Sequence, residues 1–244
     1  MSDVDLLRNY VLRHFVPLSE LAALANISPA RVRSLIEARA IPGAIYGIWP
    51  NGAYFSPIGG HHGTPIGEPA HWYSPAAAWW LRRAHDLDAH AAADLFEHRF
   101  VADFVSRLAA EPDGALGYPG AWVDGSFSPA GAAATARGEW RDWIDGGYGV
   151  CLRHWDAYHA ITKTCRRASI VRLTDEGRRQ DLTSGEIDTL LDAMEQLDAV
   201  MLPFAPHQRP HGTPGLWIDA ILVNYHLGRS RDQAQPGSPG RICA

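Results

Sequence analysis

Apolar residues recur at helical spacing along most of this chain, and that periodicity restricts the fold more than any other feature. Between residues 87 and 110 they fall three or four positions apart, as Phe96, Phe100 and Phe104 do, which places them on one face of a helix. The run Thr183-Ser184-Gly185-Glu186 matches a capping box, the pattern that starts a helix, and a further apolar stripe follows it. The pattern predicts a mostly α fold.

The first 56 residues predict a helix-turn-helix-like unit with a short hairpin. Helical spacing covers residues 4–15 and 18–25, and after a three-residue turn Ser28 and Pro29 offer an N-cap and a first helical residue for a third helix. Two helices joined by so short a turn have helix-turn-helix spacing. Residues 44–55 alternate around an Asn-Gly pair, which is typical of a hairpin.

The rest of the chain divides by composition into three further segments. Residues 57–73 are rich in glycine and proline and predict a loop-rich connection. Residues 74–228 predict a larger helical domain, on which we expect the N-terminal unit, residues 1–56, to pack. Residues 229–244 are rich in Gly, Pro, Ser and Gln, and this composition predicts a disordered tail.

Composition and charge exclude several classes of protein. The chain has 46% hydrophobic and 20% charged residues, which is typical of a globular protein, and its net charge of −5 excludes a strongly basic nucleic-acid coat. The apolar run 75–80 is far shorter than the ~20 residues of a membrane span, and the acidic start does not resemble a signal peptide. We therefore predict a soluble cytoplasmic protein without membrane contact. Lys163 is its single lysine among 22 basic residues, an arginine bias typical of actinomycetes.

No cofactor or metal is expected. The three cysteines are scattered, and the spacing of His85, His90 and His98 does not match a metal-binding pattern such as HExxH. No glycine-rich stretch has the spacing of a phosphate-binding or dinucleotide-binding loop. Cys151 lies in an apolar run and is expected to be a buried structural thiol.

DNA binding is a possible use of the helix-turn-helix, but the charge of that unit is unfavourable. Residues 1–50 contain five arginines against four acidic residues, so the unit lacks the positive charge that neutralises phosphates. Nucleic acid is therefore not the expected partner. A transcriptional regulator that reads DNA through Arg31 and Arg33 is kept as an alternative.

Two stretches carry cations that could bind an anion or an acidic partner. One is the run 147–153 with the helix after it, on which His159 and Lys163 are four positions apart. The other is the proline-rich segment 203–215, which is either a binding loop or a fixed crossover. The candidate anion- or partner-binding residues are Arg153, Lys163, Arg166, Arg167 and Arg209. The alternative is a solvated basic face balanced by nearby acidic residues.

A convergent catalytic set is not evident. His159 with Asp156 or Asp219 is the best candidate for acid–base chemistry, so a stand-alone enzyme of unknown reaction remains a further alternative. Ser126 lacks the strand–turn–helix context of a nucleophile elbow. These residues favour a component of an enzyme complex over an independent catalyst.

The same two stretches resemble a bacterial family of unknown function whose members are described as natural product biosynthesis proteins. The resemblance rests on Gly147-Tyr148-Gly149-Val150-Cys151-Leu152-Arg153, on Ile161 and Lys163, and on Leu197-Asp198 with Phe204-Ala205-Pro206, Arg209 and Gly212. It extends over nearly the whole chain to about residue 228. The chain departs from the family pattern at His207-Gln208, where Tyr-Asp is usual, and at Trp217-Ile218, where Ser-Arg is usual.

The resemblance implies an antibiotic or other natural product pathway. Some proteins of this kind resemble companions of a ring-forming enzyme, as in the aziridine-containing azabicycle of azinomycin-type compounds. It implies an accessory protein or subunit that works with a ring-forming or transferase-like partner enzyme. The substrate would be small and amino-acid-derived, and an acidic carrier protein would hold it.

Overall fold

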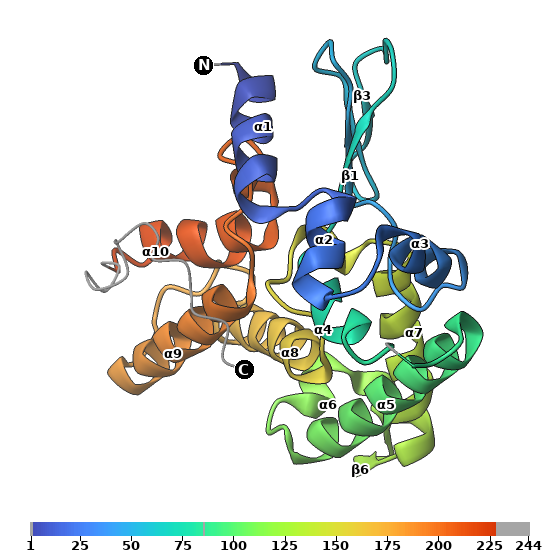
Figure 1. Ribbon diagram of the computed structural model, residues 1–244. Helices are drawn as coiled ribbons and strands as arrows, with labels where there is room; N and C mark the ends of the chain where they lie inside the picture. Colours follow the sequence, from blue (N-terminus) through green and yellow to red (C-terminus); the bar gives the residue numbers. More distant parts are fainter. Residues whose placement is uncertain (1, 85, 228–244) are drawn as a thin grey trace.

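The structure is a computed structural model that describes residues 2–84 and 86–227. It is mostly helical with a small antiparallel sheet near the N-terminus, which confirms the predicted fold class (Figure 1). The predicted tail 229–244, with Cys243, and His85 lie outside the described residues. Among the described helices none is long and apolar enough to cross a membrane.

Three helices form the N-terminal unit as their capping residues predict: α1 (Asp3–His14), α2 (Leu18–Ala25) and α3 (Pro29–Glu37). The Ser2 side chain caps α1, and the Ser28 side chain accepts a hydrogen bond from the backbone N–H of Arg31 at the start of α3. Between α2 and α3, Asn26 adopts the left-handed conformation that ends a helix. The helix-turn-helix geometry follows from these local signals.

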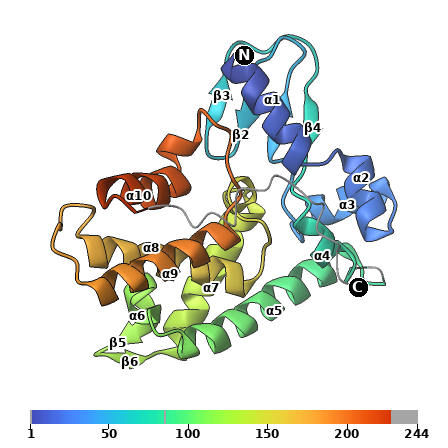
Figure 2. The same ribbon diagram turned by 90° about the vertical axis from the view of Figure 1, so that its left-hand side faces the viewer.

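A four-stranded antiparallel sheet completes this unit. Its strands are β1 (Tyr46–Ile48), β2 (Tyr54–Ser56), β3 (Gly60–His62) and β4 (Ala70–Trp72), in the order β3-β2-β1-β4. The expected hairpin is β1–β2, but the segment expected to be a loop contains β3 and β4. Strand β4 pairs with β1 across more than twenty residues, a contact that no local pattern signals. Figure 2 shows α1 lying across this sheet.

The helical body follows. Helices α4 (Ala77–Leu81), α5 (Ala89–Ala110), α6 (Gly114–Gly117) and α7 (Pro129–Ile144) lead to α8 (Ala157–Thr174) and α9 (Ser184–Val200). The strands β5 (Trp122–Val123) and β6 (Ser126–Phe127) form a small hairpin before α7. A π-helical turn, Gly215–Asp219, continues into α10 (Ala220–Asn224). Helix α8 packs along α9 and also against α5, which packs on α7 (Figure 2).

An aromatic cluster occupies the centre of the body. Trp80, Trp143 and Trp155 are almost completely buried, and the ring of Trp155 is stacked on that of Trp143 at 5.3 Å between centroids. The indole N–H of Trp80 donates a 2.9 Å hydrogen bond to the backbone carbonyl of Trp155. A buried indole N–H usually finds such a partner, and this bond holds the segment before α8 against α4.

The N-terminal unit and the helical body share one hydrophobic core. Buried residues run without a break from Leu7 in α1 through Ile45 to Ile221 in α10. Arg39 forms a 2.7 Å ion pair with Asp145 across the junction, although both side chains are mostly exposed. The junction between the two parts is therefore packed like an interior and is not a flexible linker.

Candidate functional site

The turn between α7 and α8 lies where the N-terminal unit meets the body, and its glycines allow the close approach. A Cβ on Gly146 would lie 2.6 Å from Cγ of Pro57, and a Cβ on Gly149 would lie 2.9 Å from Cγ1 of the buried Ile45. Gly146 also has a φ of +89°, which favours glycine. Contact with the N-terminal unit thus explains Gly146 and Gly149, two of the three glycines in the Gly-Gly-Tyr-Gly run.

A groove with a volume of about 350 Å³ opens beside this turn. It is lined by residues of three kinds: apolar ones after β2, acidic ones at the end of α7, and residues of the turn and of α8. These are Pro57, Ile58, Asp142, Asp145, Gly147, Tyr148, Cys151 and Lys163. Both parts of the molecule contribute, so the groove exists only when they are packed together.

Lys163 is the cation of this groove. Its Nζ lies 4.3 Å from the centre of the Tyr148 ring, and that ring is stacked on Trp155 at 4.8 Å. The side chain is half-buried, and no carboxylate of the described residues lies within ion-pair distance of it. An ammonium that is held over an aromatic face and forms no ion pair is suited to bind a carboxylate or another anionic group.

The half-buried Glu139 lies close to Tyr148. Burial raises the pKa of Glu139, and interactions with Tyr148, Lys163 and Tyr118 oppose that effect in part. Its Oε2 is fully buried and has no hydrogen-bond partner among the described residues. Burial also raises the pKa of Tyr148 and that of the Cys151 thiol, so both groups stay protonated at neutral pH. Cys151 is buried, as the sequence predicts.

Arg153 and His159 lie on either side of the start of α8. Arg153 is exposed and forms no ion pair within the described parts of the chain, while its backbone N–H donates a 3.0 Å hydrogen bond to the carbonyl of Val200. His159 Nδ1 lies 2.8 Å from the Oδ1 of Asp156, the N-cap of α8. Of the two carboxylates proposed for His159, Asp156 is the one the structure brings to it, while Asp219 pairs with Arg209.

Two of the predicted anion-binding arginines, Arg166 and Arg209, already form ion pairs within the protein. The guanidinium of Arg166 donates to Glu111 and, at 2.6 Å, to Asp113, and its side chain is only 15% exposed. This pairing ties the start of α6 to α8. An external anion would have to displace these carboxylates. Anion binding by Arg166 therefore stays a prediction, and its ion pairs give it a structural role.

Arg209 holds the proline-rich segment together. It donates two hydrogen bonds to Asp219, at 2.6 and 3.0 Å, and one of 3.1 Å to the carbonyl of Pro203. Gly215 would bring a Cβ within 2.6 Å of the Cα of Pro210, so only glycine fits there. These contacts favour the fixed crossover over the binding loop, the two alternatives that the sequence left open for 203–215.

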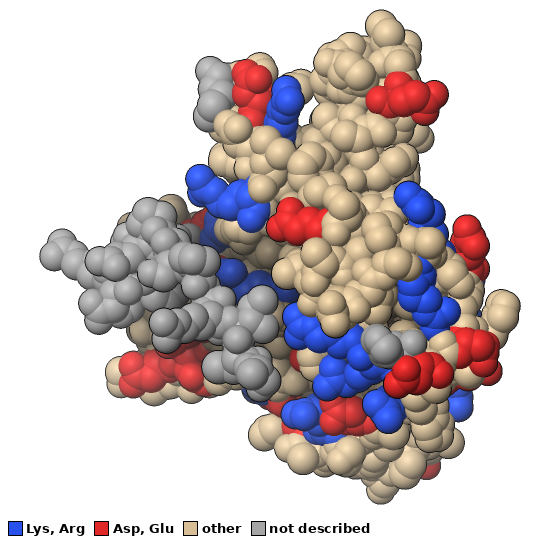
Figure 3. All heavy atoms as spheres, viewed as in Figure 1, with Lys and Arg blue, Asp and Glu red and all other residues tan. Residues whose placement is uncertain are grey.

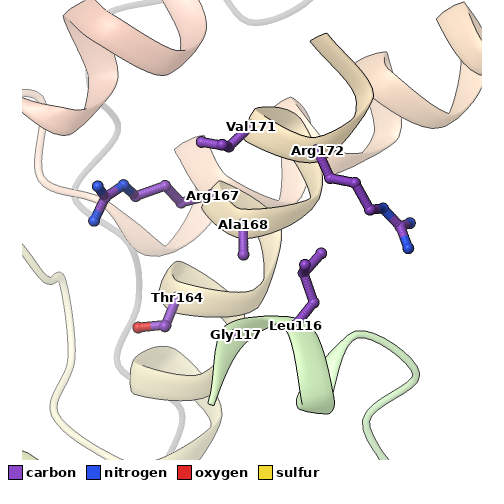
Figure 4. A pocket seen from close by; sticks show the side chains of 7 residues that line it. All are labelled: Leu116, Gly117, Thr164, Arg167, Ala168, Val171 and Arg172. Atoms are coloured by element: carbon purple, nitrogen blue, oxygen red, sulfur yellow. The ribbon is translucent and has the colours of Figure 1, made fainter. Parts of the chain in front are cut away.

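Arg167 borders a second hollow, of about 430 Å³, between α6 and α8. Figure 4 shows the short side chains of Thr164 and Ala168 near Gly117, with Arg167 and Arg172 extending to opposite sides of α8. The Arg167 guanidinium lies 5.8 Å from the Trp217 ring, and it forms no ion pair with any described residue.

Two arginines in and just after α3, the second helix of the helix-turn-helix, are engaged in contacts within the protein. The guanidinium of Arg31 donates hydrogen bonds to the carbonyls of Ala84 and Leu87, and Arg39 is paired with Asp145. Arg33 remains exposed on α3, together with Glu37. On the face shown in Figure 3, Lys and Arg side chains form a broken band with Asp and Glu among them, and the protruding sheet is mostly uncharged. This surface differs from the continuous basic stripe of a DNA reader.

The match to known families covers the helical body. Residues 93–226, more than half of the chain, match the model of a family of unknown function, DUF6058. The chain belongs to that family. No curated protein and no solved structure matches it.

The DUF6058 match begins within α5 and ends after α10. It includes Glu139, Tyr148 and Lys163, but the Pro57–Ile58 wall of the groove lies outside it. The described residues contain no group of three or more His, Cys, Asp or Glu side chains that could hold a metal ion. The groove of this DUF6058 protein therefore combines family residues with residues of the N-terminal unit.

Sequence reasoning missed three members of this site. Glu139, Asp142 and Tyr118 are far from Lys163 in sequence, and nothing in their local pattern distinguishes them from the other charged or aromatic residues. The sequence feature that came closest to indicating this site was Tyr148, in the run 147–153 on which the family resemblance rests. The buried Oε2 of Glu139 could be recognised only once the structure had placed this residue beside Tyr118, Tyr148 and Lys163.

Proposed function

We propose that this protein acts in natural product biosynthesis as an accessory protein or subunit of a partner enzyme, and that it handles a small, amino-acid-derived substrate. The observation that carries the proposal is Lys163. It is half-buried in a groove at the junction of the two parts, and it has no ion pair among the described residues. Such a cation favours a carboxylate, sulfate or phosphate over bulk water.

The partner enzyme is proposed to be ring-forming or transferase-like, with an aziridine or azabicycle as the product. This part rests on the resemblance of residues 147–153 and 204–206, with Arg209 and Gly212, to natural product biosynthesis proteins. Arg153 and Arg167 are exposed and without ion pairs among the described residues, and they are suited to contact an acidic partner or carrier protein.

The test is complex formation. The chain is co-expressed with each product of the genes next to its own, and the mixtures are examined by size-exclusion chromatography with mass detection. We expect a stoichiometric complex with one enzyme, and we expect Arg153→Glu or Arg167→Glu to weaken it at least tenfold. Arg99→Glu, on the exposed face of α5, is the control and should have no effect.

Other outcomes assign other functions. If the chain stays a monomer or homodimer in co-expression with every neighbouring gene product, the accessory role is contradicted. Salt-sensitive DNA binding lost on changing Arg33 would then favour the regulator. Turnover by the isolated chain would favour the enzyme, with His159 and Asp156, 2.8 Å apart, as the first residues to change.

A further inference from the structure

The groove beside the glycine turn contains charges of both signs that form no ion pair with each other. Lys163 and Asp142 both line it, yet they form no ion pair, and neither has another ion-pair partner among the described residues. The other acidic lining residue, Asp145, is paired with Arg39 at 2.7 Å. One cation and one anion are thus left to face the same space.

We propose that this groove binds a small zwitterion, a molecule with an ammonium group and a carboxylate. The carboxylate pairs with Nζ of Lys163 and the ammonium pairs with the carboxylate of Asp142. This inference goes beyond the accessory role, because it assigns a free small-molecule site to the chain by itself. It needs neither a partner enzyme nor a carrier protein.

Charge complementarity supports a zwitterion over a simple anion. An anion at Lys163 would also experience the negative charge of Asp142, whereas a zwitterion meets a counter-charge at both ends. A singly charged amine would be favoured by Asp142 and opposed by Lys163 in the same way. The groove therefore favours a molecule that carries both charges over a molecule that carries only one of them.

The size and the walls of the groove restrict the ligand further. A volume of about 350 Å³ is at the lower end for small-molecule pockets, so the ligand is small. The Tyr148 ring is held by its stacking on Trp155, and Ile58, which is 65% exposed, adds an apolar wall from the N-terminal unit. These surfaces are suited to a short hydrocarbon chain between the two charges.

The experiment compares zwitterions with their singly charged analogues on the purified full chain. The probes are glycine, β-alanine, γ-aminobutyrate and 5-aminovalerate, each set against the matching carboxylate without the amine and the matching amine without the carboxylate. Saturation-transfer NMR and isothermal titration give the dissociation constants. We expect at least one amino acid of the series to bind at least tenfold more tightly than both of its analogues.

Variants locate the binding. Lys163→Met and Asp142→Asn should each weaken the best zwitterion at least tenfold, while Asp188→Asn, exposed on α9, is the control and leaves it unchanged. Because Asp142 is exposed, its variant should fold even if Lys163→Met does not, and circular dichroism checks both. The inference is overturned if no zwitterion binds better than its analogues, including no binding at all, or if Asp142→Asn has no effect. Complex formation with a partner enzyme is measured separately and can fail or succeed independently.

Discussion

Glu139 is an acidic residue whose carboxyl group is largely removed from water. It lies in α7 beside two tyrosines and a lysine, its Oε2 has no hydrogen-bond partner among the described residues, and burial raises its pKa. A carboxyl group with a raised pKa in the folded chain binds more protons there than in the unfolded chain. The free energy of unfolding therefore falls as the pH rises from the usual pKa of a glutamate to the raised pKa of Glu139.

Glu139→Gln should remove this pH dependence. We expect the melting temperature of the variant to lie close to that of the natural protein near pH 4, and to exceed it by a growing margin as the pH rises toward 7, because glutamine stays neutral. Thermal unfolding at a series of pH values measures the difference. Glu195→Gln, at an exposed position on α9, serves as the control. A difference that stays constant from pH 4 to 8 would contradict the role assigned to Glu139.

Among the elements, the glycine turn 146–149 is where the helical body contacts the N-terminal unit. Its glycines differ from Gly138 within α7, where an added Cβ would meet nothing within 4 Å, because Ile45 and Pro57 approach the turn directly. Glycine is needed in the turn for close approach, whereas in a helix it costs about 1 kcal/mol relative to alanine. The same substitution should therefore have opposite effects at the two sites.

Gly149→Ala should destabilise the protein by about 1–3 kcal/mol, the usual cost of overpacking a core, while Gly138→Ala should stabilise it by about 0.5–1 kcal/mol. Ile45→Val removes the Cδ1 methyl that lies in the way, so the double variant Ile45→Val, Gly149→Ala should recover part of the loss. Urea unfolding measures all of these changes. If Gly149→Ala proves as stable as the natural protein, the proposed packing of Ile45 on the turn is wrong.

At the scale of the whole molecule, one hydrophobic core joins the helix-turn-helix unit to the helical body. The junction contains the buried Ile45 and the paired Arg39 and Asp145, and the groove is formed where the two parts meet. Parts that share a core lose much of their buried surface when they separate, so neither is expected to unfold alone.

The whole molecule should therefore unfold in one transition. Hydrogen exchange at increasing denaturant should give the same opening free energy, within about 1 kcal/mol, for the amides of β1 and for those in the middle of α8. Coincident transitions by circular dichroism and tryptophan fluorescence would agree with this. Amides of β1 that exchange through a separate opening of much lower free energy would show that the N-terminal unit is an independent domain.

Most of the secondary structure could be predicted because its signals are local. The Ser28-Pro29 start of α3 and the Thr183–Glu186 capping box before α9 act within a few residues, and both helices begin where the sequence predicts. Strand β4 could not be predicted, because its pairing with β1 depends on residues more than twenty positions away. The cations could be predicted only in part. Arg166 and Arg209 were recognised from the sequence, but the acidic residues that pair with them were not.

The sequence by itself determined the helical class, the order of the helices and the presence of one lysine near a glycine-rich turn, since periodicity, caps and residue type are properties of the chain. Only the tertiary structure decided which cations are paired and which face the groove, and which glutamate has a carboxyl oxygen buried near Tyr148. The reason is that charge pairing and burial are set by distances in space. In this protein those distances join α7, α8 and the N-terminal unit, which are far apart in sequence.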